Sequence, residues 1–274
     1  MKLEVLLSCM YQKDMSIVEH SNITGDTLVI NQTDHEATDE LQKEKQLIRM
    51  ISTSEVGLSN SRNMAIKNAT GDICLLSDDD EIFVQNYDQI IQNAFESLPD
   101  ADIITFNVTN KITRLKPTVQ KLSYLNTLKI ASYQIAFRRN AILEKEITFD
   151  PLLGAGSGNG CGEENKFLMD CLKHGLRIYF SPETIAAVNT KSSTWFFGYD
   201  KTFFYQRGAA TRYYMGSFLS LIYAIYYLLA KYSLYQAEIS FLDAAKALFS
   251  GYLKNSIKQQ KLLGLQSGLK SEKS

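Results

Sequence analysis

Residues 73–81 read ICLLSDDDE, an apolar run that ends abruptly in three aspartates and a glutamate. The apolar part predicts a buried strand, which Gly71 and Asp72 bound on its other side. In open α/β sheets, ligands bind at the carboxyl ends of the strands. Two interpretations fit the aspartates: a site that holds Mg²⁺ or Mn²⁺ through oxygen ligands, or a solvated acidic turn.

Strands and helices are expected to alternate around this stretch. A helix is predicted to begin near Ser59 and to end before Gly71, and a second to cover residues 87–98. Residues 32–45 are polar and predict a loop. Short apolar runs predict further strands at 4–8, 27–31, 46–51, 103–108 and 134–137. This alternation implies an α/β sheet with right-handed crossovers.

The composition limits the class of protein. A chain of 274 residues with 45% hydrophobic content buries a full core, and a pI of about 6.3 with a net charge of −1 argues against a nucleic-acid binder. The charge is uneven, because residues 201–274 carry ten Lys/Arg against three Asp/Glu, a net of +7. The four cysteines show no CxxC spacing, which indicates reduced core thiols.

The C-terminal part combines apolar and basic residues. Residues 213–230 carry no formal charge and are near the lower length limit for a membrane span, but five tyrosines favour an interfacial or protein-buried helix. Apolar residues then follow helical spacing over 242–257, with lysines between them. That pattern predicts contact with an anionic membrane surface. The alternative is an ordinary C-terminal helix packed on the domain.

A second acidic pair, Glu163-Glu164, stands where a glycine-rich loop meets a predicted helix. Acidic residues are common in the first turn of a helix, because they interact favourably with its dipole. Taken alone, the pair therefore favours a structural role over a catalytic one.

Taken in order, these segments resemble family-2 glycosyltransferases, which are enzymes of the GT-A fold. The resemblance rests on a small-residue-Arg-Asn helix, then Gly71-Asp72 leading into the strand and the aspartates, and then Gly162-Glu163-Glu164 at a helix start. It covers about residues 3–190. Residues 193–208, STWFFGYDKTFFYQRG, look like the tail of bacterial enzymes that build capsular or other surface polysaccharides.

The resemblance implies a fold and a division of the chain. The fold class is α/β, a Rossmann-like mixed sheet flanked by helices, with a C-terminal helical extension. Residues 1–190 would form the GT-A catalytic domain, in which 1–110 are the nucleotide-sugar half and 111–190 the acceptor half. Residues 191–274 would hold the aromatic segment and the amphipathic, basic helices.

The resemblance also implies site residues. Asp80 would bind Mn²⁺ or Mg²⁺ directly, while Asp78 would meet the ribose or a metal-bound water, and Asp79 would belong to the donor site. Glu81 would start the helix that follows instead of joining the site. The family often supplies a further metal ligand as a histidine, and this chain has Asn189 there. Glu164, or else its neighbour Glu163, would be the catalytic base, although the family usually has Asp at position 164.

Further residues are predicted to contact the substrates. Arg62 would contact the base or the diphosphate, or else would pair with an acid. Tyr11 would stack on the nucleobase, or else be a partly buried aromatic side chain. Trp195 would shape the acceptor site, or else plug the core. At the end of the second strand, polar residues replace the usual acidic pair and would read the nucleobase: Asn31, Gln32 and Asp34.

The function expected from the resemblance is an inverting, metal-dependent hexosyl- or N-acetylhexosaminyltransferase. It would use a nucleotide-sugar, a UDP-sugar by preference, and a lipid-linked saccharide acceptor at the inner face of the cell membrane. One alternative is a sugar-phosphate nucleotidyltransferase, although Ser8–Lys13 lacks the glycine-rich loop of that class. The other is a catalytically inactive, nucleotide-binding relative.

Overall fold

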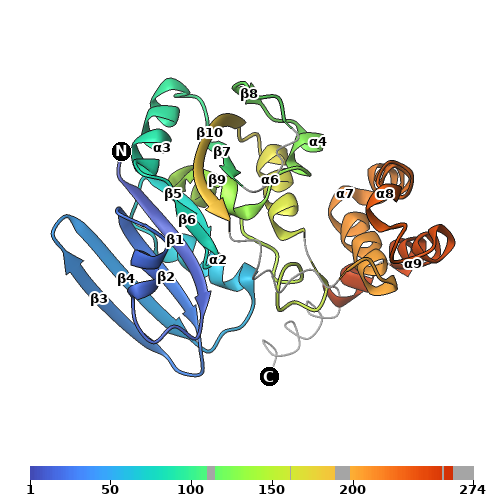
Figure 1. The fold of residues 1–274 in the computed structure, drawn as a ribbon, viewed down its shortest axis with the longest axis horizontal. Helices are drawn as coiled ribbons and strands as arrows, with labels where there is room; N and C mark the ends of the chain where they lie inside the picture. The colour runs from blue at the N-terminus through green and yellow to red at the C-terminus, as the bar shows by residue number, and fades with distance from the viewer. Residues whose placement is uncertain (110–114, 161, 189–197, 255, 262–274) are drawn as a thin grey trace, which may run out of the picture. The chain divides into compact units, whose positions relative to one another are not determined.

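The computed structural model describes residues 1–109, 115–160, 162–188, 198–254 and 256–261 (Figure 1). The chain divides into two compact units. The first comprises Met1–Phe149 and Phe167–Ser193, and the second comprises Asp150–Lys166 and Thr194–Ser274. Residues 150–166 therefore group with the C-terminal part of the chain, whereas the predicted catalytic domain of residues 1–190 includes them.

A mixed sheet forms the centre of the first unit. Over the described residues its order is β3-β4-β2-β1-β5-β9-β7-β10-β6, and β8 pairs with β10. The strands are β1 Leu3–Met10, β2 Asp26–Gln32, β3 Ala37–Lys43, β4 Gln46–Thr53, β5 Ile73–Asp78, β6 Glu81–Phe83, β7 Ile103–Thr109, β8 Gln120–Lys121, β9 Ile135–Arg138 and β10 Ile178–Val188. The five predicted strands are confirmed as β1, β2, β4, β7 and β9, and the strand before the aspartates is β5.

Four neighbouring strands, β4, β2, β1 and β5, run parallel, so their carboxyl ends meet at one edge of the sheet. The register places Asp78 of β5 opposite Ser8 of β1, and Met10 of β1 opposite Gln32 of β2. Gln32 lies in turn opposite Thr53 of β4. This edge collects the polar residues that follow the apolar part of each strand, as the sequence predicts.

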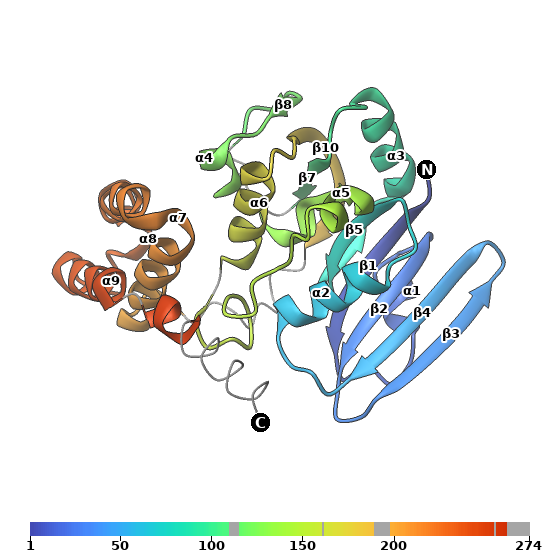
Figure 2. The ribbon, with the colours of Figure 1, turned by 180° about the vertical axis from the view of Figure 1, so that it is seen from behind.

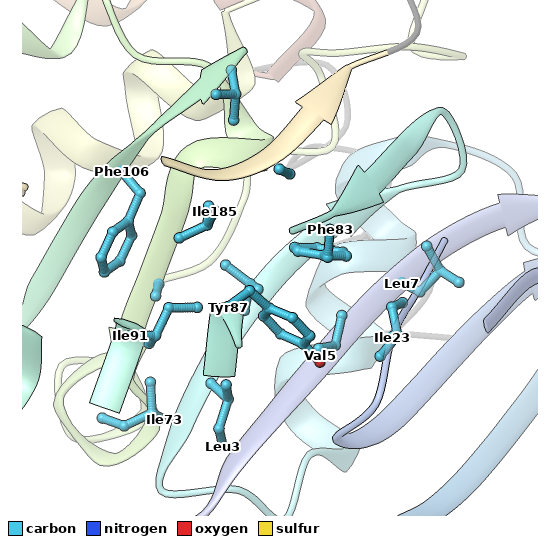
Figure 3. Packing of buried hydrophobic residues seen from close by; sticks show 14 of the residues in the cluster. Leu3, Val5, Leu7, Ile23, Ile73, Phe83, Tyr87, Ile91, Phe106 and Ile185 are labelled. Carbon is cyan, nitrogen blue, oxygen red and sulfur yellow. The ribbon is translucent and has the colours of Figure 1, made fainter. Parts of the chain in front are cut away.

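Helices cover both faces of this sheet. Successive residues of a strand point to opposite faces, so Val5 and Leu7 join one hydrophobic cluster and Leu6 joins the other. Tyr87 and Ile91 of α3 pack into the first cluster (Figure 3). On the other face, α2 lies against β1 and β2 (Figure 2). The helices of this unit are α1 Ser16–His20, α2 Leu58–Asn68, α3 Tyr87–Ser97, α4 Tyr124–Thr127, the 3-10 turn η1 Ser132–Gln134, α5 Arg139–Glu144 and α6 Glu163–Lys173, whose first turn belongs to the second unit.

Helices form the described part of the second unit beyond residue 198: α7 Lys201–Ala230, α8 Tyr232–Tyr235 and α9 Phe241–Lys254. α7 and α9 cross with their backbones in contact at two glycines. A Cβ at Gly208 would lie 2.0 Å from the carbonyl oxygen of Leu248, and a Cβ at Gly251 would lie 2.0 Å from that of Tyr205. Any larger residue at either position would force the two helices apart.

Two predictions about local structure are wrong. Residues 37–43, predicted as a loop, form the edge strand β3, whose partner among the described strands is β4. Because nearly all its side chains are exposed, it shows no apolar alternation from which a strand could be predicted. Glu81, predicted to start a helix, instead opens the short strand β6, and α3 begins later, at Tyr87.

Candidate active site

The three aspartates lie where β5 ends at the carboxyl edge of the parallel strands. Asp78 is the last residue of β5, and Asp79 and Asp80 form the turn that leads into β6. The apolar run before them is fully buried, so the chain changes from core to sheet edge within two residues. Partial burial and the charge of Asp78 both raise the pKa of Asp79.

A buried arginine holds the carboxylate of Asp78. The Arg62 guanidinium donates from Nη2 to both Asp78 oxygens, at 3.0 and 3.2 Å. Arg62 is only 1% exposed and lies over the ring of Phe149, 5.4 Å from its centroid. Ser132 Oγ also donates to Asp78 Oδ2, at 3.2 Å. Of the two roles proposed for Arg62, pairing with an acid is the one observed, and it fixes the orientation of Asp78.

Glu81 lies beneath this turn and was not predicted to belong to the site. Its Oε2 accepts a hydrogen bond from the backbone N–H of Asp78 at 3.1 Å, and its Oε1 has no hydrogen-bond partner among the described residues. Burial, followed by the negative charge of Asp78, holds the pKa of Glu81 well above its ordinary value. The contact with the Asp78 backbone ties Glu81 to the turn that carries the aspartates.

The loop after β1 is held by an amide clamp. Asn31 Oδ1 accepts from the Gln12 backbone N–H, and Asn31 Nδ2 donates to the Gln12 carbonyl, each at 2.9 Å. Tyr11 precedes this clamp with a left-handed backbone (φ 52°) and an exposed ring. The structure thus gives Asn31 a positioning role for the loop that presents Tyr11, whereas stacking by Tyr11 stays a prediction.

The end of β2 positions the helix that carries Arg62. Gln32 Oε1 accepts from the backbone N–H of Gly57, immediately before α2, at 2.7 Å. Asp34 lies beyond the strand with its carboxylate exposed, and its Oδ1 is 3.0 Å from His35 Nδ1. This contact with His35 lowers the pKa of Asp34. Contact of Gln32 or Asp34 with a nucleobase stays a prediction.

The acidic pair of the second unit opens α6, as predicted. Glu163 is buried, and its Oε2 accepts from the Gly162 backbone N–H at 3.1 Å. The glycine-rich loop packs closely on it, because a Cβ at Gly154 would lie 3.0 Å from Glu163 Cδ. Glu164 is the more exposed member of the pair. Asn189 and Trp195 lie outside the described residues, so their predicted roles stay predictions.

Replacing Arg62 by Met is expected to lower the free energy of unfolding by about 2–3 kcal/mol, because the partly buried Asp78 loses its charged hydrogen-bond partner. Urea denaturation followed by circular dichroism measures this. Lys67→Met on the same helix is the matched control, since Lys67 is exposed and a surface substitution changes stability by about 0.5 kcal/mol at most. Equal losses in the two variants would contradict the role given to the Arg62–Asp78 pair.

The sequence and the fold were compared with known proteins. Residues 28–151 match glycosyl transferase family 2. No curated protein sequence matches the chain. Among solved structures, S. aureus TarS 1-349 in complex with UDP aligns with a TM-score of 0.58 at 12% identity, covering 96% of this chain and 92% of that one. TarS 1-349 in complex with UDP-GlcNAc aligns with a TM-score of 0.56 at 15% identity, covering 94% and 73%.

A third similar structure is the mannosyltransferase PcManGT from Pyrobaculum calidifontis in complex with GDP-Man and Mn²⁺. Its TM-score is 0.53 at 13% identity, and the alignment covers 98% of this chain and 80% of that one. At these identities the likeness concerns the fold, and it confirms the predicted α/β class with a C-terminal helical region. Residues 28–151 thus carry the sequence pattern of glycosyl transferase family 2, and together with the shared fold they support a family-2 glycosyltransferase of the GT-A fold.

Proposed function

We propose that this glycosyltransferase is inverting and metal-dependent, and that it moves a sugar from a UDP-sugar to a lipid-linked saccharide in surface polysaccharide synthesis. The observation that carries the proposal is the Asp78–Asp80 turn at the carboxyl edge of the parallel strands, with Asp78 fixed by buried Arg62. UDP is favoured because similar structures were solved with UDP and with UDP-GlcNAc.

The residues of the turn fit a divalent metal in an open site. Asp79 and Asp80 offer hard oxygen ligands, and the repulsion between neighbouring carboxylates such as Asp78 and Asp79, which adds to burial in raising the pKa of Asp79, would be relieved by a cation. Among the described residues, no three His, Cys, Asp or Glu side chains converge to enclose an ion. One or two carboxylates with substrate phosphates are a common way to hold Mg²⁺. When bound by Asp80, the metal would neutralise the leaving diphosphate.

The protein's own groups would perform the remaining steps. Asp78, held by Arg62, would orient the ribose, and Tyr11 would stack on the base. The acceptor hydroxyl oxygen attacks the anomeric carbon while the bond from that carbon to the diphosphate oxygen breaks. The hydroxyl proton passes to the Glu164 carboxylate, which acts as general base. One displacement of this kind inverts the anomeric centre.

A membrane-linked acceptor is favoured by the second unit. Of its described helices, α7 alone is long and apolar enough by length and composition to be a membrane helix, but its backbone is non-helical at Gly216, so it supports contact with a membrane and not a span. The stretch 201–274 also carries a net charge of +7, which suits the anionic cytoplasmic leaflet. We therefore place the enzyme at the inner face of the cell membrane, as a peripheral protein.

A donor screen tests the proposal. Melting temperatures are measured with UDP-, GDP- and dTDP-sugars, each with Mn²⁺ and with a chelator. A ligand at about 100 times its Kd stabilises the folded state by about 2.7 kcal/mol, so the true donor class should raise the melting temperature by about 5 °C or more.

UMP is the matched control for that screen, because it keeps the base and ribose but lacks the diphosphate. We expect UMP to give a smaller shift that does not depend on Mn²⁺. A donor shift of equal size in chelator would contradict metal dependence, and no shift with any nucleotide-sugar would contradict the proposed donor site.

A further inference from the structure

The helix α7 is two helices joined at Gly216, where the backbone leaves the helical region (φ 76°, ψ −178°). The rings of Phe204 and Tyr227 are 6.2 Å apart, whereas a straight α-helix would separate those positions by roughly 35 Å. Arg207 Nη1 likewise donates to Tyr223 Oη at 2.9 Å. The second half, residues 217–230, therefore folds back on the first half as a helical hairpin.

This hairpin is too short to cross a bilayer. The second half has 14 residues, a length of roughly 21 Å, while the hydrocarbon core of a membrane is about 30 Å thick. The backbone at the turn is also satisfied inside the protein: Ser220 Oγ donates to the Gly216 carbonyl, and Tyr252 Oη donates to the Ser217 carbonyl at 3.0 Å. The break at Gly216 is thus built into the unit.

The second half of α7 has two apolar faces, of which only one is covered. Its inner face, which includes Ala224, Tyr227 and Leu228, joins the core that α9 completes. The outer face repeats at helical spacing and is exposed: Phe218 is 74%, Ile222 51%, Ile225 47% and Leu229 64% exposed. No charged residue interrupts this outer face. A contiguous exposed apolar surface of this kind marks an interaction site.

The charges around the outer face select the partner. Lys231 follows the hairpin directly, with Nζ 5.8 Å from the ring centroid of half-exposed Tyr226, and such aromatic and basic residues anchor proteins at membrane interfaces. Glu238 and Asp243 are the acids among the described residues 201–254 and 256–261, and they stand against eight Lys/Arg. The net charge of this helical region is therefore positive.

We propose that the outer face of α7 (Phe218, Ile222, Ile225 and Leu229) inserts into the interface of an anionic lipid bilayer, with the helix parallel to the membrane plane. The inference rests on the proposed lipid-linked acceptor and names the surface that meets the lipid. It adds a surface to the membrane contact predicted for the helix of residues 242–257, which stays a prediction. In the structure, Ala244, Leu248 and Gly251 of α9 are buried in the second unit, while Leu242 and Leu253 are exposed.

Flotation of the full chain with lipid vesicles tests this surface. Wild type should float with vesicles of phosphatidylcholine and phosphatidylglycerol, and much less with phosphatidylcholine alone or at high salt, because surface charge is screened. Phe218→Gln with Leu229→Gln should weaken vesicle binding at least about tenfold. Lys231→Gln should weaken it about fivefold.

Val119→Gln with Leu125→Gln is the matched control, since these apolar residues of the first unit are 54% and 65% exposed. It should float like wild type. Equal flotation of the α7 variant, or no flotation of wild type, would overturn the inference. So would self-association of wild type that the α7 variant abolishes, because the face would then bind a second copy of the chain.

Thermal shift with a UDP-sugar separates this inference from the proposed function. Both double variants should keep their circular dichroism and their donor-induced shift, because neither changes the Asp78–Asp80 turn. If wild type floats but binds no nucleotide-sugar, the proposed function fails while the membrane surface stands. If wild type binds the donor but does not float, the inferred membrane surface fails while the proposed function stands.

Discussion

Glu164→Gln is expected to lower kcat by about 10²–10⁴-fold while donor affinity stays unchanged, because an amide of the same shape cannot take the acceptor proton. Steady-state transfer to a saccharide acceptor measures kcat, and thermal shift with UDP-sugar and Mn²⁺ measures donor binding. The separation of the two readouts is the informative result, since loss of both would indicate a misfolded loop rather than a missing base.

Glu163→Gln is the matched control, one residue away and with the same chemical change. Glu163 is buried and accepts a hydrogen bond from the Gly162 backbone N–H, which a glutamine oxygen can also accept. This variant should keep most of its activity. If it lost kcat with normal donor binding while Glu164→Gln did not, the base would be Glu163.

The apolar runs of the sequence predicted most of the first unit. β1, β2 and β5 bury nearly every residue, so their apolar character is continuous and identifies them without an alignment. The polar residues at their carboxyl ends could be placed at one sheet edge because each of them directly follows such an apolar run. β3 was missed because its exposed side chains carry no such pattern, and it is held in the sheet by its antiparallel pairing with β4 and not by a buried apolar face.

The contacts inside the site could not be predicted in the same way. Asp78 meets Arg62 and Ser132, which lie 16 and 54 residues away in sequence, and only the packing of α2 and η1 beside β5 brings them together. Glu81 looked like a solvated helix start because nothing local signals its burial beneath the turn. Asn31 carries the right chemistry for a nucleobase, yet its amide holds the Gln12 backbone.

The helical hairpin of α7 could not be predicted from the sequence either. A single glycine in an uncharged run, Gly216, is compatible with one long helix or with two. Its conformation depends on whether the second half gains more by packing against Phe204 and α9 than by continuing straight. Tertiary burial decides this, so the length of the apolar run by itself overstates the membrane-spanning potential of α7.

Asp80→Asn is expected to remove the Mn²⁺ dependence of donor binding and to lower kcat/KM by about 10³-fold, since a bound metal supplies several kcal/mol of charge stabilisation to the leaving diphosphate. Isothermal titration of UDP-sugar with and without Mn²⁺ measures the first effect. Asp39→Asn is the control for charge alone, because Asp39 is an exposed carboxylate of β3 in the same unit.

Asp79→Asn decides the register of the metal ligands within the three aspartates. Asp79 is adjacent to Asp80 in the same turn, so both variants lose one negative charge at nearly the same place. A general electrostatic effect would therefore weaken Mn²⁺-dependent binding equally in both. A direct ligand at Asp80 predicts that Asp79→Asn keeps a measurable Mn²⁺ effect, whereas complete loss in Asp79→Asn with retention in Asp80→Asn would shift the ligand by one residue.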